Sequence, residues 1–93
     1  MIAKDAIGIA KRHVMETFSD EGIANLGLEE IEFDSDDNAW RVTLGFSRPW
    51  DRPSGHLGES LGVAPGRSYK VVLLSDRDGR LLSIKNRDVR IAA

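Results

Sequence analysis

The chain has 93 residues, of which 41% are hydrophobic and 30% charged, with a formal net charge of −2 and no cysteine. This length suits one domain, residues 1–93, and the composition is that of a soluble globular protein, with no indication of a disordered or fibrous one. Without cysteine there is neither a disulfide framework nor a thiolate metal site.

The first segment lacks the uninterrupted apolar core of a signal peptide, because charged residues interrupt it at Lys4, Asp5, Lys11 and Arg12. No stretch approaches the roughly 18 apolar residues of a membrane span. We therefore expect a soluble, cytoplasmic protein without a membrane partner.

Charge divides unevenly along the chain. Residues 1–46 carry four Lys or Arg against ten Asp or Glu, whereas residues 47–93 carry nine against five. We interpret this asymmetry as acidic and basic strands that face each other in one sheet, since cross-strand pairs of opposite charge are favourable. The alternative is a basic half that binds nucleic acid.

Residues 2–20 have the period of an amphipathic helix. Ile2, Ala6 and Met15 widen a stripe of apolar residues spaced three or four apart, which consists of Ala3, Ile7, Ala10, Val14 and Phe18. Gly22 can take the left-handed conformation that ends a helix. Such a helix needs an apolar surface to lie on.

Two strands follow, joined by a polar turn. Ile31 and Phe33 alternate with acidic residues over 28–34, which is the two-residue period of a strand with one buried and one solvent-exposed face. Residues 34–38, DSDDN, read as a turn because Asp, Ser and Asn side chains bond to nearby backbone groups. Over 39–47 the apolar residues again alternate with smaller or polar ones, and they are Trp40, Val42, Leu44 and Phe46.

The third and fourth strands, 68–76 and 81–91, are joined by a turn that carries the Asp-Gly hairpin signal at Asp78 and Gly79. Leu82 and Ile84 lie on one side of the fourth strand, and we expect a bulge near Asn86 to return Val89 and Ile91 to the core. The third strand is apolar on both sides, with Tyr69, Val71 and Leu73 on one and Val72 and Leu74 on the other. One helix covers one face, so we expect the second face, to which we assign Leu74, to meet the segment 48–66 or another molecule.

This order predicts an α+β fold with an N-terminal helix packed on a four-stranded antiparallel meander and a long Pro/Gly-rich loop between the second and third strands. Three stretches carry a resemblance: the W-x-V strand at Trp40 to Val42, the Y-x-V strand at Tyr69 to Val71, and the hairpin at Asp76 to Leu82. With them the chain resembles the PepSY family and, more broadly, cystatin-like sheets wrapped on a helix. The resemblance implies a non-catalytic module that binds or restrains a protein partner, peptidases having been proposed.

The insert, residues 48–66, is longer than most loops of compact domains, and such loops are usually functional or disordered. Prolines at positions 49, 53 and 65 restrict its backbone, which argues against a flexible linker. We expect it to fold back over the second sheet face and to offer the contact surface for a protein or peptide, because Trp and Arg are enriched in such contacts. Its candidate residues are Arg48, Trp50, Arg52 and His56. A homodimer through the open face or an edge of the sheet is a further possibility.

Other functions have weaker sequence support. Binding of single-stranded nucleic acid would use the basic hairpin residues Arg77, Arg80, Lys85, Arg87 and Arg90, but the aromatic content is only 6%. The acidic turn lacks the glycine and the glutamate of an EF-hand loop, and no phosphate-binding motif is present. His13 and His56 form no recognisable catalytic motif, so we expect no enzyme, no metal and no cofactor. A small-ligand or enzymatic pocket under residues 48–66 is the least favoured alternative.

Overall fold

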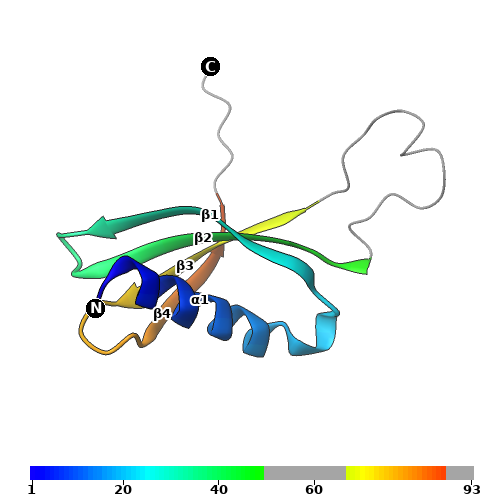
Figure 1. Ribbon diagram of the computed structural model, residues 1–93, viewed down its shortest axis with the longest axis horizontal. Helices are drawn as coiled ribbons and strands as arrows, with labels where there is room; N and C mark the ends of the chain where they lie inside the picture. Colours follow the sequence, from blue (N-terminus) through cyan, green and yellow to red (C-terminus); the bar gives the residue numbers. More distant parts are fainter. Residues whose placement is uncertain (50–66, 88–93) are drawn as a thin grey trace, which may run out of the picture.

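A computed structural model describes residues 1–49 and 67–87. It contains the helix α1 (Ala3–Thr17), a short 3₁₀ helix η1 (Ser19–Glu21), and the strands β1 (Ala24–Asp34), β2 (Ala39–Ser47), β3 (Ser68–Ser75) and β4 (Leu81–Asn86). The strands form one antiparallel sheet in the order β1-β2-β3-β4, and α1 lies across it (Figure 1). The expected α+β fold and its meander are confirmed. The Pro/Gly-rich loop lies, from residue 50 to 66, outside the described residues.

Small residues let α1 approach the sheet closely. Ala6, Ala10 and Val14 are fully buried against it. Ile2 and Met15, which we expected to widen the stripe, are 64% and 51% exposed. The buried stripe is thus narrower than predicted, because these two residues turn toward solvent.

In the part of the chain that the structure describes, no helix combines the length and hydrophobicity needed to cross a membrane.

The helix is shorter than predicted, since it ends at Thr17 and a 3₁₀ turn follows it. Gly22 takes the predicted left-handed conformation, with φ of 60°, which glycine adopts without strain, but it ends the 3₁₀ turn and not α1. Phe18 packs its ring 5.5 Å from that of Phe46 and anchors this end of α1 on the sheet.

The core lies between α1 and two central strands. Val42, Leu44 and Phe46 of β2 and Val72 and Leu74 of β3 have no exposed surface. The register explains this, because Val42 pairs with Val72 and Trp40 with Leu74, and paired residues share a face. Our assignment of Leu74 to the uncovered face was therefore wrong: it lies beneath the helix.

β4 also differs from the prediction. The ladder between β3 and β4 slips where Leu73 pairs with Ser83 and Leu74 with Leu81, so Leu82 is the extra residue. Leu81 and Ile84 pack against the core, whereas Leu82 is 42% exposed. The bulge therefore lies at Leu82, not near Asn86, where β4 ends. The predicted return of residues 89 and 91 falls outside the described residues.

Both predicted turns are present. The Asp34 carboxylate accepts hydrogen bonds from the backbone N–H groups of Asp36 and Asp37 at 3.0 and 3.3 Å. In the second turn Gly79 has φ of +71°, and the Asp78 carboxylate accepts a hydrogen bond from the backbone N–H of Arg80. That hydrogen bond lowers the pKa of Asp78 from its usual value.

One arginine fastens the neighbouring ends of β2 and β3. Arg48 Nη1 lies 2.9 Å from Glu21 Oε1, and its Nη2 donates to the hydroxyl of Ser68 at 2.7 Å. Phe46 pairs with Ser68 in the sheet beside it. We call these contacts of Arg48, Glu21 and Ser68 the stem clamp.

Candidate functional site

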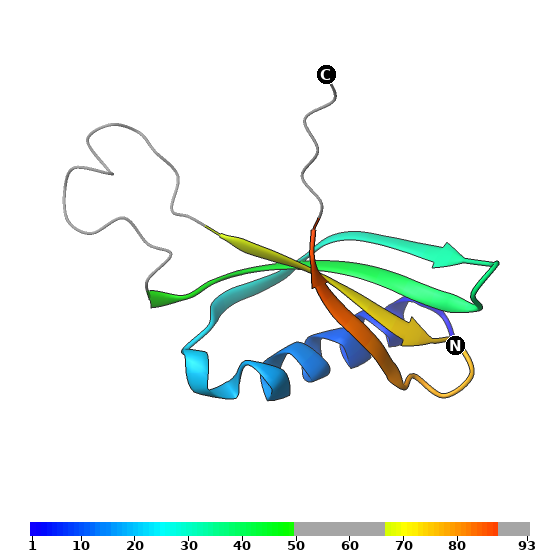
Figure 2. The same ribbon diagram turned by 180° about the vertical axis from the view of Figure 1, so that it is seen from behind.

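Among the described residues, α1 covers one face of the sheet and no element packs on the other (Figures 1 and 2). We call this second side the open face. Its side chains come from alternate positions of all four strands, because successive residues of a strand point to opposite sides. The open face is the side of the sheet that no described element covers, and the candidate site lies on it.

Strand register arranges the open face in rows that cross the sheet. In the row that we call the charged row, Glu30 of β1 pairs with Thr43 of β2, Thr43 with Val71 of β3, and Val71 with Lys85 of β4. An acidic residue thus begins this row and a basic residue ends it. Thr43 is only 4% exposed, so the centre of the charged row is already close-packed.

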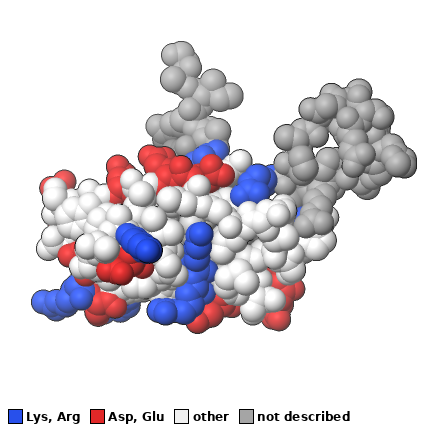
Figure 3. Space-filling view, in the orientation of Figure 1, with Lys and Arg blue, Asp and Glu red and all other residues white. Residues whose placement is uncertain are grey.

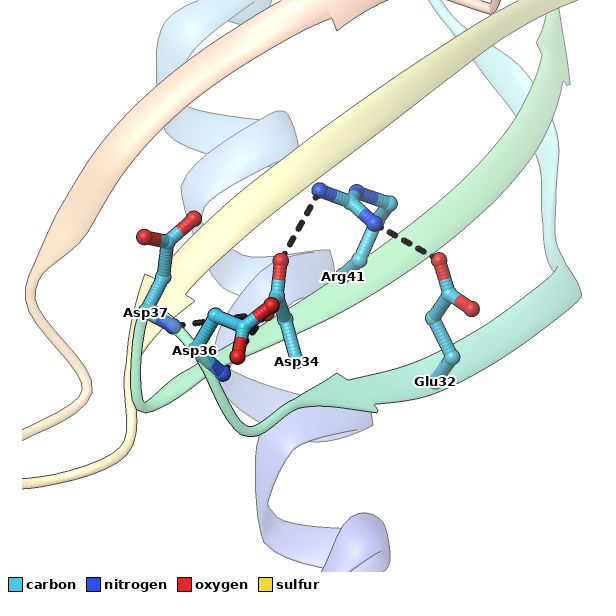
Figure 4. Close-up of polar contacts among 5 residues, drawn as sticks. All are labelled: Glu32, Asp34, Asp36, Asp37 and Arg41. Carbon is cyan, nitrogen blue, oxygen red and sulfur yellow. Dashed lines mark hydrogen bonds and ion pairs between the residues drawn. The ribbon is translucent and has the colours of Figure 1, made fainter.

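The next row carries a compact ion cluster at its β1 end. Arg41 Nη1 lies 2.7 Å from Glu32 Oε1, and its Nη2 lies 3.3 Å from Asp34 Oδ2 (Figure 4). The hydrogen bond with Glu32, and attraction to both carboxylates, raise the pKa of Arg41. Figure 4 shows that the backbone N–H groups of Asp36 and Asp37, in the turn, donate hydrogen bonds to the Asp34 carboxylate. These bonds orient the carboxylate toward the Arg41 guanidinium.

Side chains of β1, of β3 and of the residue before β3 converge above Gly45 at the other end of the open face. A Cβ at this position would stand 2.9 Å from Arg67 Nη2, 2.9 Å from Glu29 Oε1 and 3.0 Å from the Tyr69 ring. Glycine is thus the residue that leaves room for them. Arg67 Nη2 also donates to the backbone carbonyl of Asn25 at 2.9 Å, and the guanidinium of Arg87 stacks 4.0 Å from the Tyr69 ring centroid.

An apolar stripe runs along β3 between these charged ends. Tyr69, Val71 and Leu73 are half-buried and lie side by side on the open face. A groove of about 300 Å³ follows the stripe and is lined by Arg41, Val71, Leu73, Ser83, Lys85 and Asn86. The open face thus has an apolar centre and charged margins.

The two charged margins have opposite signs. β1 contributes Glu29, Glu30, Glu32 and Asp34, and acidic side chains gather along its edge in Figure 3. Lys85 and Arg87 lie at the β4 side. Our expectation that acidic and basic strands face each other was wrong, because β1 and β4 occupy opposite edges of the sheet. Of the basic residues within 67–87, Arg67 alone forms an ion pair with the acidic strand, 4.0 Å from Glu29.

A second hollow, about 820 Å³ in volume, lies along the first turns of α1. It is larger than the groove on the open face, but its lining comes from one helix and the residue before it: Met1, Lys4, Asp5, Gly8, Ile9 and Arg12. Residues of a single helix surface do not converge on a bound group from several sides. We therefore regard the open face as the better candidate.

Of the four contact residues proposed from sequence, the structure describes one, Arg48. Arg48 belongs to the stem clamp and lies 5.7 Å from the Phe46 ring centroid, a structural environment on the helix side. Trp50, Arg52 and His56 lie outside the described residues, as does Arg90. The sequence reasoning missed Glu30, Thr43, Val71 and Lys85 as a unit, because only the register aligns them.

The other proposed groups are spread apart. Arg77 and Arg80 lie in the turn between β3 and β4, whereas Arg87 follows β4 at the opposite end of that strand. His13 Nε2 contacts the carbonyl oxygen of Gly79 at 3.4 Å, where it links α1 to that turn. No group of three or more metal-ligating side chains comes together within residues 1–49 and 67–87.

Comparison with protein-family models, with curated proteins and with solved structures gave no match for this chain.

Proposed function

We propose that the chain is a non-catalytic protein-interaction module that binds a protein or peptide partner through the open face. The supporting observation is the half-buried stripe of Tyr69, Val71 and Leu73 between charged margins. Contact surfaces between proteins commonly have an apolar centre within a polar rim. A contiguous apolar stripe rimmed by charge is therefore typical of an interaction site.

The proposal agrees in kind with the PepSY-like resemblance, which implies a partner-binding module. It differs in the surface used, since the sequence placed the contact at Arg48, Trp50, Arg52 and His56. Contact by those residues stays a prediction, and so does a cytoplasmic location. A pocket under residues 48–66 for a small ligand or a reaction also stays a prediction.

A photo-crosslinking experiment tests the use of the open face. Replacing Ser83, which lines the groove, with a benzophenone amino acid places the probe beside the apolar stripe. We expect irradiation in cell extract to give defined protein adducts, identified by mass spectrometry. Adding Leu73→Arg should abolish these adducts, because a charge would then occupy the apolar stripe.

The matched control carries the same probe at Met15, which is 51% exposed on α1. Circular dichroism should show that each variant is folded. Identical adducts from positions 83 and 15 would contradict the proposal, as would a probe at 83 that reacts only within its own chain.

Nucleic acid is the second candidate, favoured by the stack of Arg87 on Tyr69. Arginine and aromatic side chains together can hold single strands. The acidic residues of β1 on the same face would repel phosphates, so we prefer a protein partner. Nucleic-acid adducts at position 83, with affinity that falls steeply as salt is added, would reverse this preference.

A further inference from the structure

The two ends of the charged row lack ion-pair partners in the described part of the chain. Glu30 and Lys85 make no salt bridge there, although Glu29, Glu32 and Asp34 each do. Glu30 and Lys85 cannot pair with each other within one sheet. Three strand spacings separate them, roughly 14 Å at about 4.8 Å per spacing.

Symmetry determines how such a face meets a second copy of itself. Two sheets that pack face to face lie about 10 Å apart with nearly aligned strands. A two-fold axis running along the strands, between β2 and β3, places β1 of one copy over β4 of the other. An axis running across the strands would instead place the acidic β1 over its own acidic counterpart.

We infer that the open face binds a second copy of this chain about a two-fold axis that runs along the strands. Each charged row then lies over the same row of its partner, in the reverse direction. Glu30 faces Lys85 of the other copy, twice in the dimer, and Thr43 faces Val71. The inference rests on the proposed function and identifies the partner by this self-complementary order of charges.

The apolar stripe gives this dimer its centre. Val71, with Leu73 and Tyr69 on either side along β3, lies next to the axis and is removed from water on both copies. The sheet is about 19 Å wide across its four strands, and β4 limits their shared length to about 20 Å. The open face is therefore small compared with a standard interface of about 800 Å² per partner. We therefore expect dimerisation to depend on concentration in the micromolar range.

Light scattering after size exclusion, over a concentration series up to about 1 mM, measures the dimerisation constant. We expect the wild-type chain to pass from monomer to dimer. Glu30→Lys alone and Lys85→Glu alone should each weaken the dimer about tenfold or more, because both symmetric contacts become repulsive.

An equimolar mixture of the two single variants is the decisive sample. One chain then carries lysine at both ends of the charged row and the other carries glutamate, so a mixed dimer regains both attractive contacts. We expect the mixture to dimerise like the wild type, and the double variant Glu30→Lys/Lys85→Glu to do the same alone. An effect within one chain could not be rescued by mixing.

Glu16→Lys and Arg12→Glu on α1 are matched controls, since they change the net charge by the same amounts at exposed helix positions. They should leave the dimerisation constant unchanged. A wild-type monomer throughout the series would overturn the inference, as would a dimer that ignores the charge reversals or a mixture that stays monomeric. If crosslinks at position 83 to a different protein survive these results, the proposed function stands without self-association.

Discussion

The two faces of the sheet are built from the same strands but differ in how they are completed. On the helix side, Phe46, Val72 and Leu74 have no exposed surface. On the open face, Val71 and Leu73 from the same stretch of β3 stay half-buried, and charged residues surround them. Apolar side chains on this sheet therefore need not belong to the core: one set stabilises the fold, and the other is available for a partner.

The neighbouring leucines of β3 provide the largest expected contrast. Leu74→Ala should lower the free energy of unfolding by about 2 to 5 kcal/mol, because it opens a cavity beneath α1. Leu73→Ala, on the open face, should cost about 1 kcal/mol or less. Urea titrations at low micromolar concentration would measure both values. Equal costs would mean that the open face is buried within the monomer, against our description.

Two glycines, one in the turn beneath α1 and one on the open side, should differ by a smaller amount. Gly79→Ala should lower the free energy of unfolding by about 1 to 2 kcal/mol, since Gly79 has φ of +71° and its Cβ would stand 3.0 Å from Ile9 Cδ1. Gly27 pairs with Gly45 on the open side, and a Cβ there would meet nothing within 4 Å. Gly27→Ala should therefore change stability by no more than about 0.5 kcal/mol. Thermal unfolding of both variants tests the difference, and a larger loss for Gly27→Ala would refute it.

The smallest expected effect concerns the ion cluster of the open face. Arg41→Gln removes the contacts with Glu32 and Asp34 and should cost about 0.2 to 1 kcal/mol, because the Arg41 side chain is 40% exposed. The loss should shrink in high salt, which screens surface charges. Arg12→Gln on α1 serves as the control in the same urea titrations at low and high salt. A loss that does not change with salt would mean that Arg41 contributes through packing of its carbon chain.

Local patterns were enough to predict the helix, the order of the strands and both turns. The alternation of Val42, Leu44 and Phe46 identified the buried side of β2, and the Asp-Gly pair at 78 and 79 identified the hairpin. These signals lie within a few residues of the structure that they specify. The slip at Leu82 escaped prediction because a strand with one extra residue still contains apolar residues on both sides.

The candidate site could not be predicted, because it depends on the register between β2 and β3, two strands that residues 48–66 separate in the sequence. A third strand that is apolar on both sides gives no indication of which side meets the helix. The pairing of Trp40 with Leu74 places Leu74 on the helix side, and no local sequence signal sets that register. The same pairing aligns Glu30, Thr43, Val71 and Lys85 from four separate strands.

The stem clamp holds the two strand ends between which residues 50–66 run. Because Arg48 ties Ser68 and Glu21 together where β2 ends and β3 begins, the sheet holds these two strand ends in place by its own contacts. The free-energy cost of closing a loop rises only by about 0.6 kcal/mol for each doubling of its length. The chain between the clamped ends is thus a suitable position for inserting a tag, a sensor or a binding peptide, and the two faces of the sheet should keep their shape.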